Sequence, residues 1–200
     1  MSKKKTKPVD PPEVVELFEI IADLFAQAEG LDNVVIRNVG AKYATKNNFY
    51  SGAGAAKTGG RWNPKGLEAI YTSLDVETAK LEAYQDFIYR GFLLTAITPR
   101  VTAGAKVKLS KVLDLTDVKV LKKIGFTKKE LILEDWRAIQ KARDESWTQA
   151  IGRGVYVAGF EGLIVPSARK DDGKNIVSFP KRLAKTSKID ILGADQLPVK

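Results

Sequence analysis

Short apolar segments alternate along the chain with stretches of helical periodicity, and this alternation is the feature that most constrains the fold. A short strand buries its apolar face only in a sheet that other elements cover. Short strands with helices inserted between them are typical of an α+β domain, and 200 residues are enough for one ample domain. We therefore expect a single α+β domain. The segments predicted as strands are Val34–Arg37, Ala69–Ser73, Leu93–Ile97, the surroundings of Val107 and of Val112, Gly162–Pro166, Asn175–Phe179 and Ile189–Leu192.

Capping residues and apolar spacing mark the predicted helices. Asp10 followed by two prolines is a helix start, because an acceptor side chain precedes residues that lack an N–H group. Asp75 caps a second helix in the same way. The predicted helices are 10–30, 75–88, 131–141 and a short one at Trp147, and a long Gly-rich loop spans 40–66. We expect a flexible basic tail over 1–9, the N-terminal helix over 10–30 and the rest of the domain over 31–200.

The chain contains neither cysteine nor histidine. Disulfides and thiolate metal sites are therefore excluded, and the usual base of hydrolases and the commonest zinc ligand are missing. We expect no metal, and a chemistry that depends on Glu, Asp, Arg, Lys, Tyr and Ser. No apolar run approaches the ~18 residues of a membrane helix, and no apolar segment follows the first lysines as in a signal peptide. We therefore expect a cytoplasmic protein with no membrane contact.

The formal net charge is +9, and the isoelectric point is near 9.6. A basic surface of this kind attracts nucleic acid, an acidic protein partner or a phosphate-rich small molecule, whereas a solvated lysine-rich face explains it equally well. Tyr43, Tyr50 and Trp62 near basic residues would allow nucleic-acid binding by stacking and phosphate contacts. The basic residues form no compact stripe, so nucleic-acid binding is an alternative and not the first interpretation.

The Gly-rich loop matches neither common nucleotide motif. Lys57-Thr58 follows Ala56 where a P-loop requires glycine, and Lys57 stands where a dinucleotide fingerprint requires its third glycine. The loop ends in Gly59-Gly60-Arg61-Trp62-Asn63. Gly60 would let the backbone approach a ligand closely, Arg61 offers a planar fork that suits pyrophosphate, and Trp62 offers a flat face. The alternative is a surface turn that a buried Trp62 anchors.

Three more polar residues stand beside apolar segments. Glu82 lies at the edge of the apolar face of the second helix, so its carboxylate could point into a cleft or be an ordinary boundary residue. Ser167 follows a buried strand, and without histidine it is better suited to hydrogen bonding than to nucleophilic attack. Arg37 ends the first strand and needs an acidic partner or an anionic ligand if it is buried.

Taken together, these residues give the sequence a resemblance to the RES domain family, which is named for its Arg, Glu and Ser signature residues. The resemblance covers about residues 33–192, and the matching segments follow the family's order. They are Arg37, Gly59-Gly60-Arg61-Trp62-Asn63 with Gly66, Tyr71-Thr72-Ser73, Ala79 with Glu82, Leu113-Asp114-Leu115, Gln149-Ala150-Ile151-Gly152, Gly159-Phe160-Glu161-Gly162-Leu163, Pro166-Ser167-Ala168-Arg169, and Asn175 with Phe179.

The resemblance implies a fold like that of ADP-ribosyltransferases, with mixed or antiparallel sheets and inserted helices. It also implies a bacterial toxin that destroys NAD⁺ by hydrolysis or phosphorolysis of the nicotinamide–ribose bond and so arrests growth. The alternative within the same family is transfer of ADP-ribose to a protein target. The implied partner is a cognate Xre-type antitoxin that covers the active site, and contact with DNA is expected only through that antitoxin. NAD⁺ is the substrate, and no cofactor is expected.

We expect Glu82 to stabilise the positive charge that develops on the ribose, and Arg61 with Arg37 to grip the pyrophosphate. Tyr71 would stack on nicotinamide or position the ribose, and Ser167 would hydrogen-bond the ribose. The predicted site comprises the catalytic residues Arg61, Tyr71, Glu82 and Ser167 and the substrate-binding residues Arg37, Gly60, Trp62, Asn63, Ser73, Arg169 and Asn175.

Overall fold

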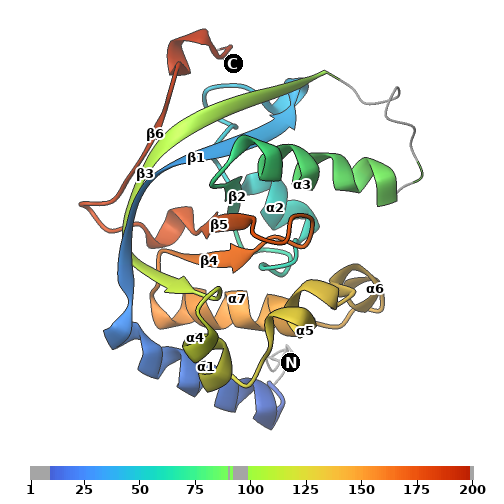
Figure 1. Ribbon diagram of the computed structural model, residues 1–200, viewed down its shortest axis with the longest axis vertical. Helices are drawn as coiled ribbons and strands as arrows, with labels where there is room; N and C mark the ends of the chain where they lie inside the picture. Colours follow the sequence, from blue (N-terminus) through green and yellow to red (C-terminus); the bar gives the residue numbers. More distant parts are fainter. Residues whose placement is uncertain (1–9, 90, 92–98, 199–200) are drawn as a thin grey trace, which may run out of the picture.

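The structure, a computed structural model, describes residues 10–89, 91 and 99–198. The predicted tail over 1–9 and the predicted strand Leu93–Ile97 lie outside the described residues. The described part is one α+β domain, as the sequence predicted (Figure 1). Within it, no helix combines the length and the apolar character that crossing a membrane requires.

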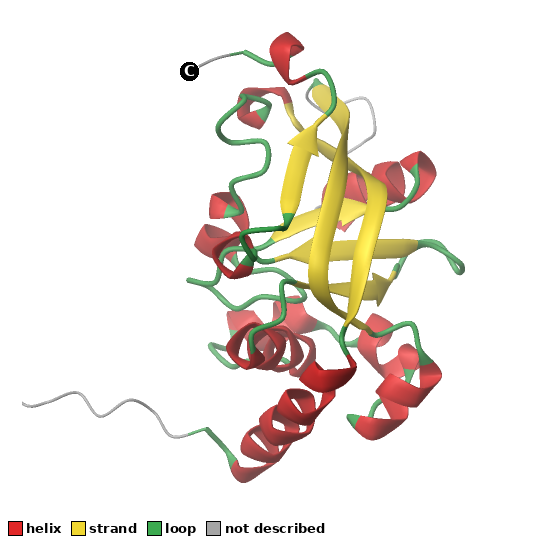
Figure 2. Ribbon diagram, turned by 90° about the vertical axis from the view of Figure 1, so that its left-hand side faces the viewer, coloured by secondary structure: helices red, strands yellow, loops and turns green. Residues whose placement is uncertain are grey.

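The strands pair into one mixed sheet that closes on itself. Its order is β1-β2-β5-β4-β3-β6, and β1 also pairs with β3, so the first five strands form a closed circuit. Only β3 and β4 run parallel; the other pairs are antiparallel. Figure 2 shows the two long strands, β1 and β3, running side by side across the shorter ones. The bounds are β1 Glu29–Gly40, β2 Ile70–Ser73, β3 Arg100–Asp114, β4 Gly162–Pro166, β5 Lys174–Ser178 and β6 Lys188–Ile191.

Strands β1 and β3 are longer than predicted, because a partner strand supports residues that carry no local apolar signal. The predicted short strands near Val107 and Val112 belong to the single strand β3, which pairs with β1 from Gly40↔Arg100 to Glu29↔Val112. Along β3, buried residues such as Val107 alternate with exposed lysines. This period of two is typical of a strand with one wet face.

The helices also differ from the prediction in five places. The N-terminal helix predicted over 10–30 ends at Leu24, because Glu29 already pairs in β1, and α4 was not predicted. A short helix, α2, lies inside the predicted Gly-rich loop, and the last predicted helix is twelve residues long because Ser146 and Gln149 form a capping box at its start. The predicted helix 131–141 is two helices, because Asp135 accepts a hydrogen bond from Ala138 N and begins a new one. The bounds are α1 Pro12–Leu24, α2 Ala53–Thr58, α3 Val76–Tyr89, α4 Val118–Lys123, α5 Lys128–Leu133, α6 Trp136–Lys141 and α7 Trp147–Ala158.

The largest core cluster lies where α1 and α7 cover the sheet. Leu17 and Ile21 of α1 pack with Val155 of α7 and with sheet residues such as Leu163. A second cluster lies inside the curved sheet, between β1, β3 and β5. The N-terminal helix therefore shares the core of the domain, although the resemblance begins only after it.

Helix α7 lies against the segment that follows α2. A Cβ atom at Gly152 would lie 1.9 Å from the carbonyl oxygen of Trp62, so only glycine allows this approach. On the same helix, Gln149 donates from Nε2 to the carbonyl oxygen of Gly60 at 3.0 Å and to Oε1 of Gln140 at 2.9 Å. Helices α6 and α7 thus fix the backbone of the segment that the sequence analysis assigned to the site.

We expect Gly152→Ala to lower the free energy of unfolding by about 3 kcal/mol, because the added methyl group forces α7 away from the backbone of Trp62. The matched control is Gly54→Ala in α2, where no atom lies within 4 Å of the added Cβ. The control should gain about 0.5–1 kcal/mol from helix propensity. Urea unfolding curves would measure both, and equal midpoints for the two variants would contradict the packing described.

Candidate active site

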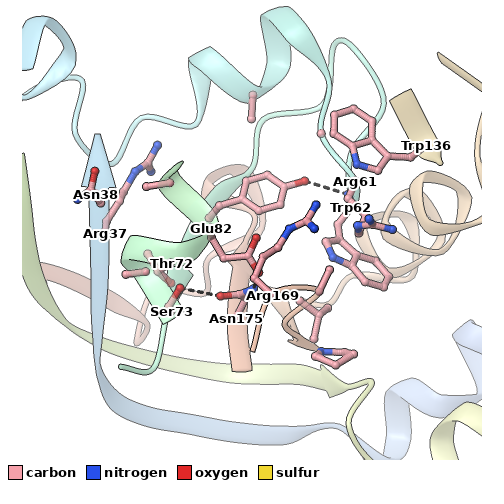
Figure 3. A pocket seen from close by; sticks show the side chains of 18 of the residues that line it. Arg37, Asn38, Arg61, Trp62, Thr72, Ser73, Glu82, Trp136, Arg169 and Asn175 are labelled. Carbon is pink, nitrogen blue, oxygen red and sulfur yellow. Dashed lines mark hydrogen bonds between the residues drawn. The ribbon is translucent and has the colours of Figure 1, made fainter. Parts of the chain in front are cut away.

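A cavity of about 340 Å³ lies between β1, β2, α3, the segment that follows α2, and α6 (Figure 3). This volume falls in the range of small-molecule sites. Of the predicted site residues, only Asn63 and Ser167 are absent from its wall. The predicted residues that line it are Arg37, Gly60, Arg61, Trp62, Tyr71, Ser73, Glu82, Arg169 and Asn175.

The carboxylate of Glu82 is held in the cavity wall by two donors. Ser167 Oγ donates to Glu82 Oε1 at 2.7 Å, and Asn175 Nδ2 donates to the same oxygen at 2.8 Å. Asn175 is oriented in turn by Ser73, whose hydroxyl donates to Asn175 Oδ1 at 2.6 Å. Both donors end on Oε1, so within the described residues Oε2 of Glu82 keeps no hydrogen bond. This arrangement fixes the carboxylate and leaves one oxygen for a ligand.

Ser167 orients the carboxylate of Glu82, and each hydrogen-bonding position of its hydroxyl is occupied by a protein group. The backbone N–H groups of Arg169 and Lys170 donate to Ser167 Oγ at 3.0 and 3.2 Å, while its proton goes to Glu82. A hydroxyl has one donor and two acceptor positions, and all three are occupied. Ser167 is also buried. The expected hydrogen bond from Ser167 to a ribose is therefore replaced by one that orients the carboxylate.

The turn that carries Ser167 is tied to the start of α3. Lys170 Nζ lies 3.4 Å from Oδ1 of Asp75 and 3.1 Å from Oε2 of Glu77. Asp75 also caps α3, because it accepts hydrogen bonds from N and Oγ1 of Thr78. These hydrogen bonds hold the pKa of Asp75 below its usual value, so the cap stays ionised. The helix that carries Glu82 and the turn that orients it are thereby fixed to each other.

Arg61 is held at the opposite wall by main-chain carbonyls. Its Nη1 donates to the carbonyl oxygens of Leu131 at 2.7 Å and of Glu134 at 3.1 Å. Burial lowers the pKa of Arg61, and the nearby carboxylates of Glu134 and Glu82 oppose this shift. Both bonds use Nη1, so the rest of the guanidinium group is free of hydrogen bonds within the described residues. It remains available to a ligand in the cavity.

Glu134, in the linker between α5 and α6, holds those carbonyls in place. Its carboxylate accepts from Trp147 N at 2.7 Å and from Thr148 N at 2.9 Å, and also from the hydroxyl of Thr148. The N–H groups at a helix start otherwise lack a partner, so this carboxylate caps α7. The linker that carries the carbonyl of Glu134 toward Arg61 is therefore anchored to the start of α7.

Tyr71 and Asn63 have structural contacts beneath the cavity. The hydroxyl of Tyr71 accepts from Trp62 N at 2.9 Å and donates to Asn63 Oδ1 at 2.7 Å. Burial raises the pKa of Tyr71, so the phenol stays neutral. Asn63 donates to the carbonyl oxygens of Ala55 and Leu67, and its side chain is completely buried. Trp62 is buried too, which agrees with the alternative that this residue anchors a turn.

Arg37 is a half-buried cation that forms no ion pair with a carboxylate among the described residues. Its guanidinium lies 5.6 Å from the ring centroid of Tyr50, and its Nη1 is buried with no hydrogen-bond partner. Burial lowers the pKa of Arg37 to about 10, so it is still charged at neutral pH. A buried, unpartnered donor is costly unless a ligand satisfies it. Arg37 therefore points to an oxygen-rich or anionic ligand in this cavity.

The arginines lie on different sides of the cavity. Figure 3 shows Arg37 beside Asn38 on one side, and Arg61 and Arg169 together on the other. The charge of Arg61 interacts with those of Arg169 and Arg137. We therefore revise the expectation that Arg37 and Arg61 grip one pyrophosphate, because Arg169 is the nearer neighbour of Arg61.

Trp136 was not predicted as a site residue. It is the first residue of α6 and lines the cavity with Arg137. Its helical surroundings made it look like a core residue. The signal that could have found it is the helix start at Asp135, because residues at a helix start often face a neighbouring loop. The lining thus combines one carboxylate with several guanidinium groups and the indoles of Trp62 and Trp136. Within the described residues, no three carboxylates gather as a metal site would require.

Comparison with known proteins agrees with the fold and with the family resemblance. The RES domain family matches residues 35–199 of the sequence. The chain belongs to the RES domain family. Its fold is similar to that of a chain in the crystal structure of the M. tuberculosis MbcT–MbcA toxin–antitoxin complex, with a TM-score of 0.68 and 20% identity. That match covers 91% of this chain and 90% of the other. We found no match among curated proteins.

We expect Glu134→Ala to lower the free energy of unfolding by about 1–2 kcal/mol, the usual effect of removing a cap. The variant loses the acceptor for two N–H groups at the start of α7. Glu16→Ala, an exposed position within α1, is the control that removes a carboxylate with no effect on the linker. Thermal unfolding followed by circular dichroism would measure the difference. Identical transitions for the two variants would show that the carboxylate of Glu134 does not hold the linker.

Proposed function

We propose that this RES protein is the toxin of a toxin–antitoxin pair and that it cleaves the nicotinamide–ribose bond of NAD⁺. Loss of NAD⁺ would then arrest growth. The observation that carries this proposal is the carboxylate of Glu82, which Ser167 and Asn175 fix through one oxygen in a cavity that arginines line. The carboxylate suits the positive charge that develops on the ribose, and the arginines suit the negative charges of the pyrophosphate.

The bond cleavage requires charge stabilisation and little acid–base chemistry. When the bond between the ribose carbon and the nicotinamide nitrogen breaks, the electron pair goes to nicotinamide, which leaves as a neutral molecule. The ribose becomes an oxocarbenium ion, as in glycoside cleavage. The free oxygen of Glu82 would stabilise this ion, and the fixed carboxylate needs no reorganisation to do so. Water or phosphate then adds to the ribose carbon and releases a proton to solvent.

The guanidinium groups would bind the rest of the dinucleotide. Among the described residues, most donors of Arg61 have no protein partner, and Arg169 lies beside it (Figure 3). Two planar cations match the two charges of the pyrophosphate. Arg37 would donate its buried Nη1 to a substrate oxygen on the other side of Glu82. In this assignment Tyr71 and Trp62 form part of the wall, Asn63 supports it from behind, and none of the three reacts.

The proposed partner is a cognate Xre-type antitoxin. The similar solved structure is that of a toxin–antitoxin complex, which supports an antitoxin for this chain as well. A net charge of +9 favours an acidic partner surface. We propose that the antitoxin covers the cavity and that contact with DNA occurs only through it.

We expect Glu82→Gln to reduce the release of nicotinamide from NAD⁺ by ~10²–10³, the usual effect of removing one positioned charge. The amide keeps the shape of the side chain but cannot stabilise a cation. The measurement is nicotinamide release from NAD⁺ by purified protein, with and without phosphate, beside Glu16→Gln as a control of equal charge change. Full activity of Glu82→Gln would contradict the assigned role.

The wild-type result in the same experiment names the acceptor. Dependence on phosphate indicates phosphorolysis, and release in its absence indicates hydrolysis. Release only in the presence of added protein substrates would identify an ADP-ribosyltransferase. No release under any of these conditions, together with salt-dependent retention on nucleic acid, would favour the nucleic-acid alternative and overturn the proposal.

We expect Ser167→Ala to lower kcat by up to ~10² with little change in KM, because a small misplacement of Glu82 weakens a transition-state interaction. The structure gives Ser167 no contact with the cavity, so substrate binding should persist. Steady-state kinetics of nicotinamide release would separate the two constants. A rise in KM at unchanged kcat would instead mean that Ser167 contacts the substrate directly.

A further inference from the structure

We infer that Trp136 forms the subsite for the adenine ring of the dinucleotide, at the opposite end of the cavity from the bond that breaks. This inference rests on the proposed function and adds to it the orientation of the substrate. Trp136 is half-buried and lines the cavity at the start of α6. The guanidinium of Arg137 lies 4.4 Å from the centroid of the Trp136 ring. An indole with a cation on one face offers a flat surface for an electron-rich base.

The order of groups along the cavity matches the order of groups in NAD⁺. Figure 3 shows Trp136 and Glu82 on opposite sides, with the guanidinium group of Arg169 between them and Arg61 on the side of Trp136. Arg61 is hydrogen-bonded to the carbonyl of Glu134, two residues before Trp136, and its charge also interacts with that of Glu82. Carboxylate, guanidinium and indole thus follow one another as reacting ribose, pyrophosphate and distal base do.

Charge decides which of the two bases lies against Trp136. The nicotinamide ring of NAD⁺ carries a positive charge, whereas adenine is neutral. Arg137 stacks on Trp136, and Arg61 interacts electrostatically with Arg137. Cations this close to the indole would repel nicotinamide and would not repel adenine. The adenine end of the substrate therefore fits here, and the nicotinamide end lies at the carboxylate of Glu82, which attracts its positive charge.

Hydrogen bonds on both sides of Trp136 hold the backbone that carries its indole. Asp135 accepts from Ala138 N at 3.1 Å and so fixes the first turn of α6. The preceding residue, Glu134, is bound to the start of α7. A ring on a fixed helix start loses little freedom when a base stacks on it, which favours binding.

The test compares two substrates with the same scissile bond, NAD⁺ and nicotinamide mononucleotide, which lacks the adenosine half. We expect Trp136→Ala to raise KM for NAD⁺ by ~10–100-fold, the usual effect of losing one stacked base, with kcat little changed. The kinetics with nicotinamide mononucleotide should stay as in the wild type. Trp136→Phe should restore most of the NAD⁺ affinity, because it keeps an aromatic face.

Trp147→Ala is the matched control, because Trp147 packs on Phe126 and does not line the cavity. Calorimetric binding of ADP-ribose supplies a readout that needs no catalysis, and only Trp136→Ala should weaken it. Equal losses with both substrates, or unchanged ADP-ribose binding, would overturn the adenine subsite. Wild-type protein that neither cleaves NAD⁺ nor binds ADP-ribose would instead overturn the proposed function.

Discussion

The hydrogen bonds that end on one oxygen of Glu82 join the parts of the fold that form the cavity. Ser167 brings in the turn after β4, and Asn175 brings in β5. Ser73 extends the same chain of bonds to β2. Because each donor is oriented by a further contact, the carboxylate cannot turn without disturbing three strands and α3. A catalytic charge that is fixed in this way needs no reorganisation when the transition state forms.

In the cavity wall, Arg37 and Arg61 keep donors that no protein group satisfies within the described residues. The Nη1 atom of Arg37 is buried and has no hydrogen-bond partner, and burial lowers the pKa of both Arg37 and Arg61. Buried cations of this kind oppose folding unless other groups compensate their charge. Within the described residues, the compensation for Arg61 comes from two main-chain carbonyls and from the nearby carboxylates of Glu134 and Glu82. An anionic ligand would remove this cost. The free protein is therefore preorganised for an anion that it does not itself supply.

Local signals predicted much of the fold, and non-local contacts account for what they missed. The cap at Asp75 and the apolar run of β4 depend on neighbouring residues, so the sequence predicts them directly. The length of β3 depends on its pairing with β1, which no local pattern records. In the site, residue types predicted most of the residues that line the cavity. They did not predict that the Ser167 hydroxyl donates to Glu82 and not to a ligand. Trp136 was missed because helical periodicity does not tell a core face from a cavity face.

The predicted residues thus divide into two groups by what they touch. Asn63 and Ser167 lie behind the wall and hold backbone or carboxylate in place, whereas Glu82, Arg61 and Arg37 present groups to the cavity. The family resemblance includes residues of both groups alike. Only the contacts separate them, and they explain how a chain without histidine could catalyse the reaction. Its polar residues arrange one carboxylate and several guanidinium groups, and the neutral leaving group makes a strong acid unnecessary.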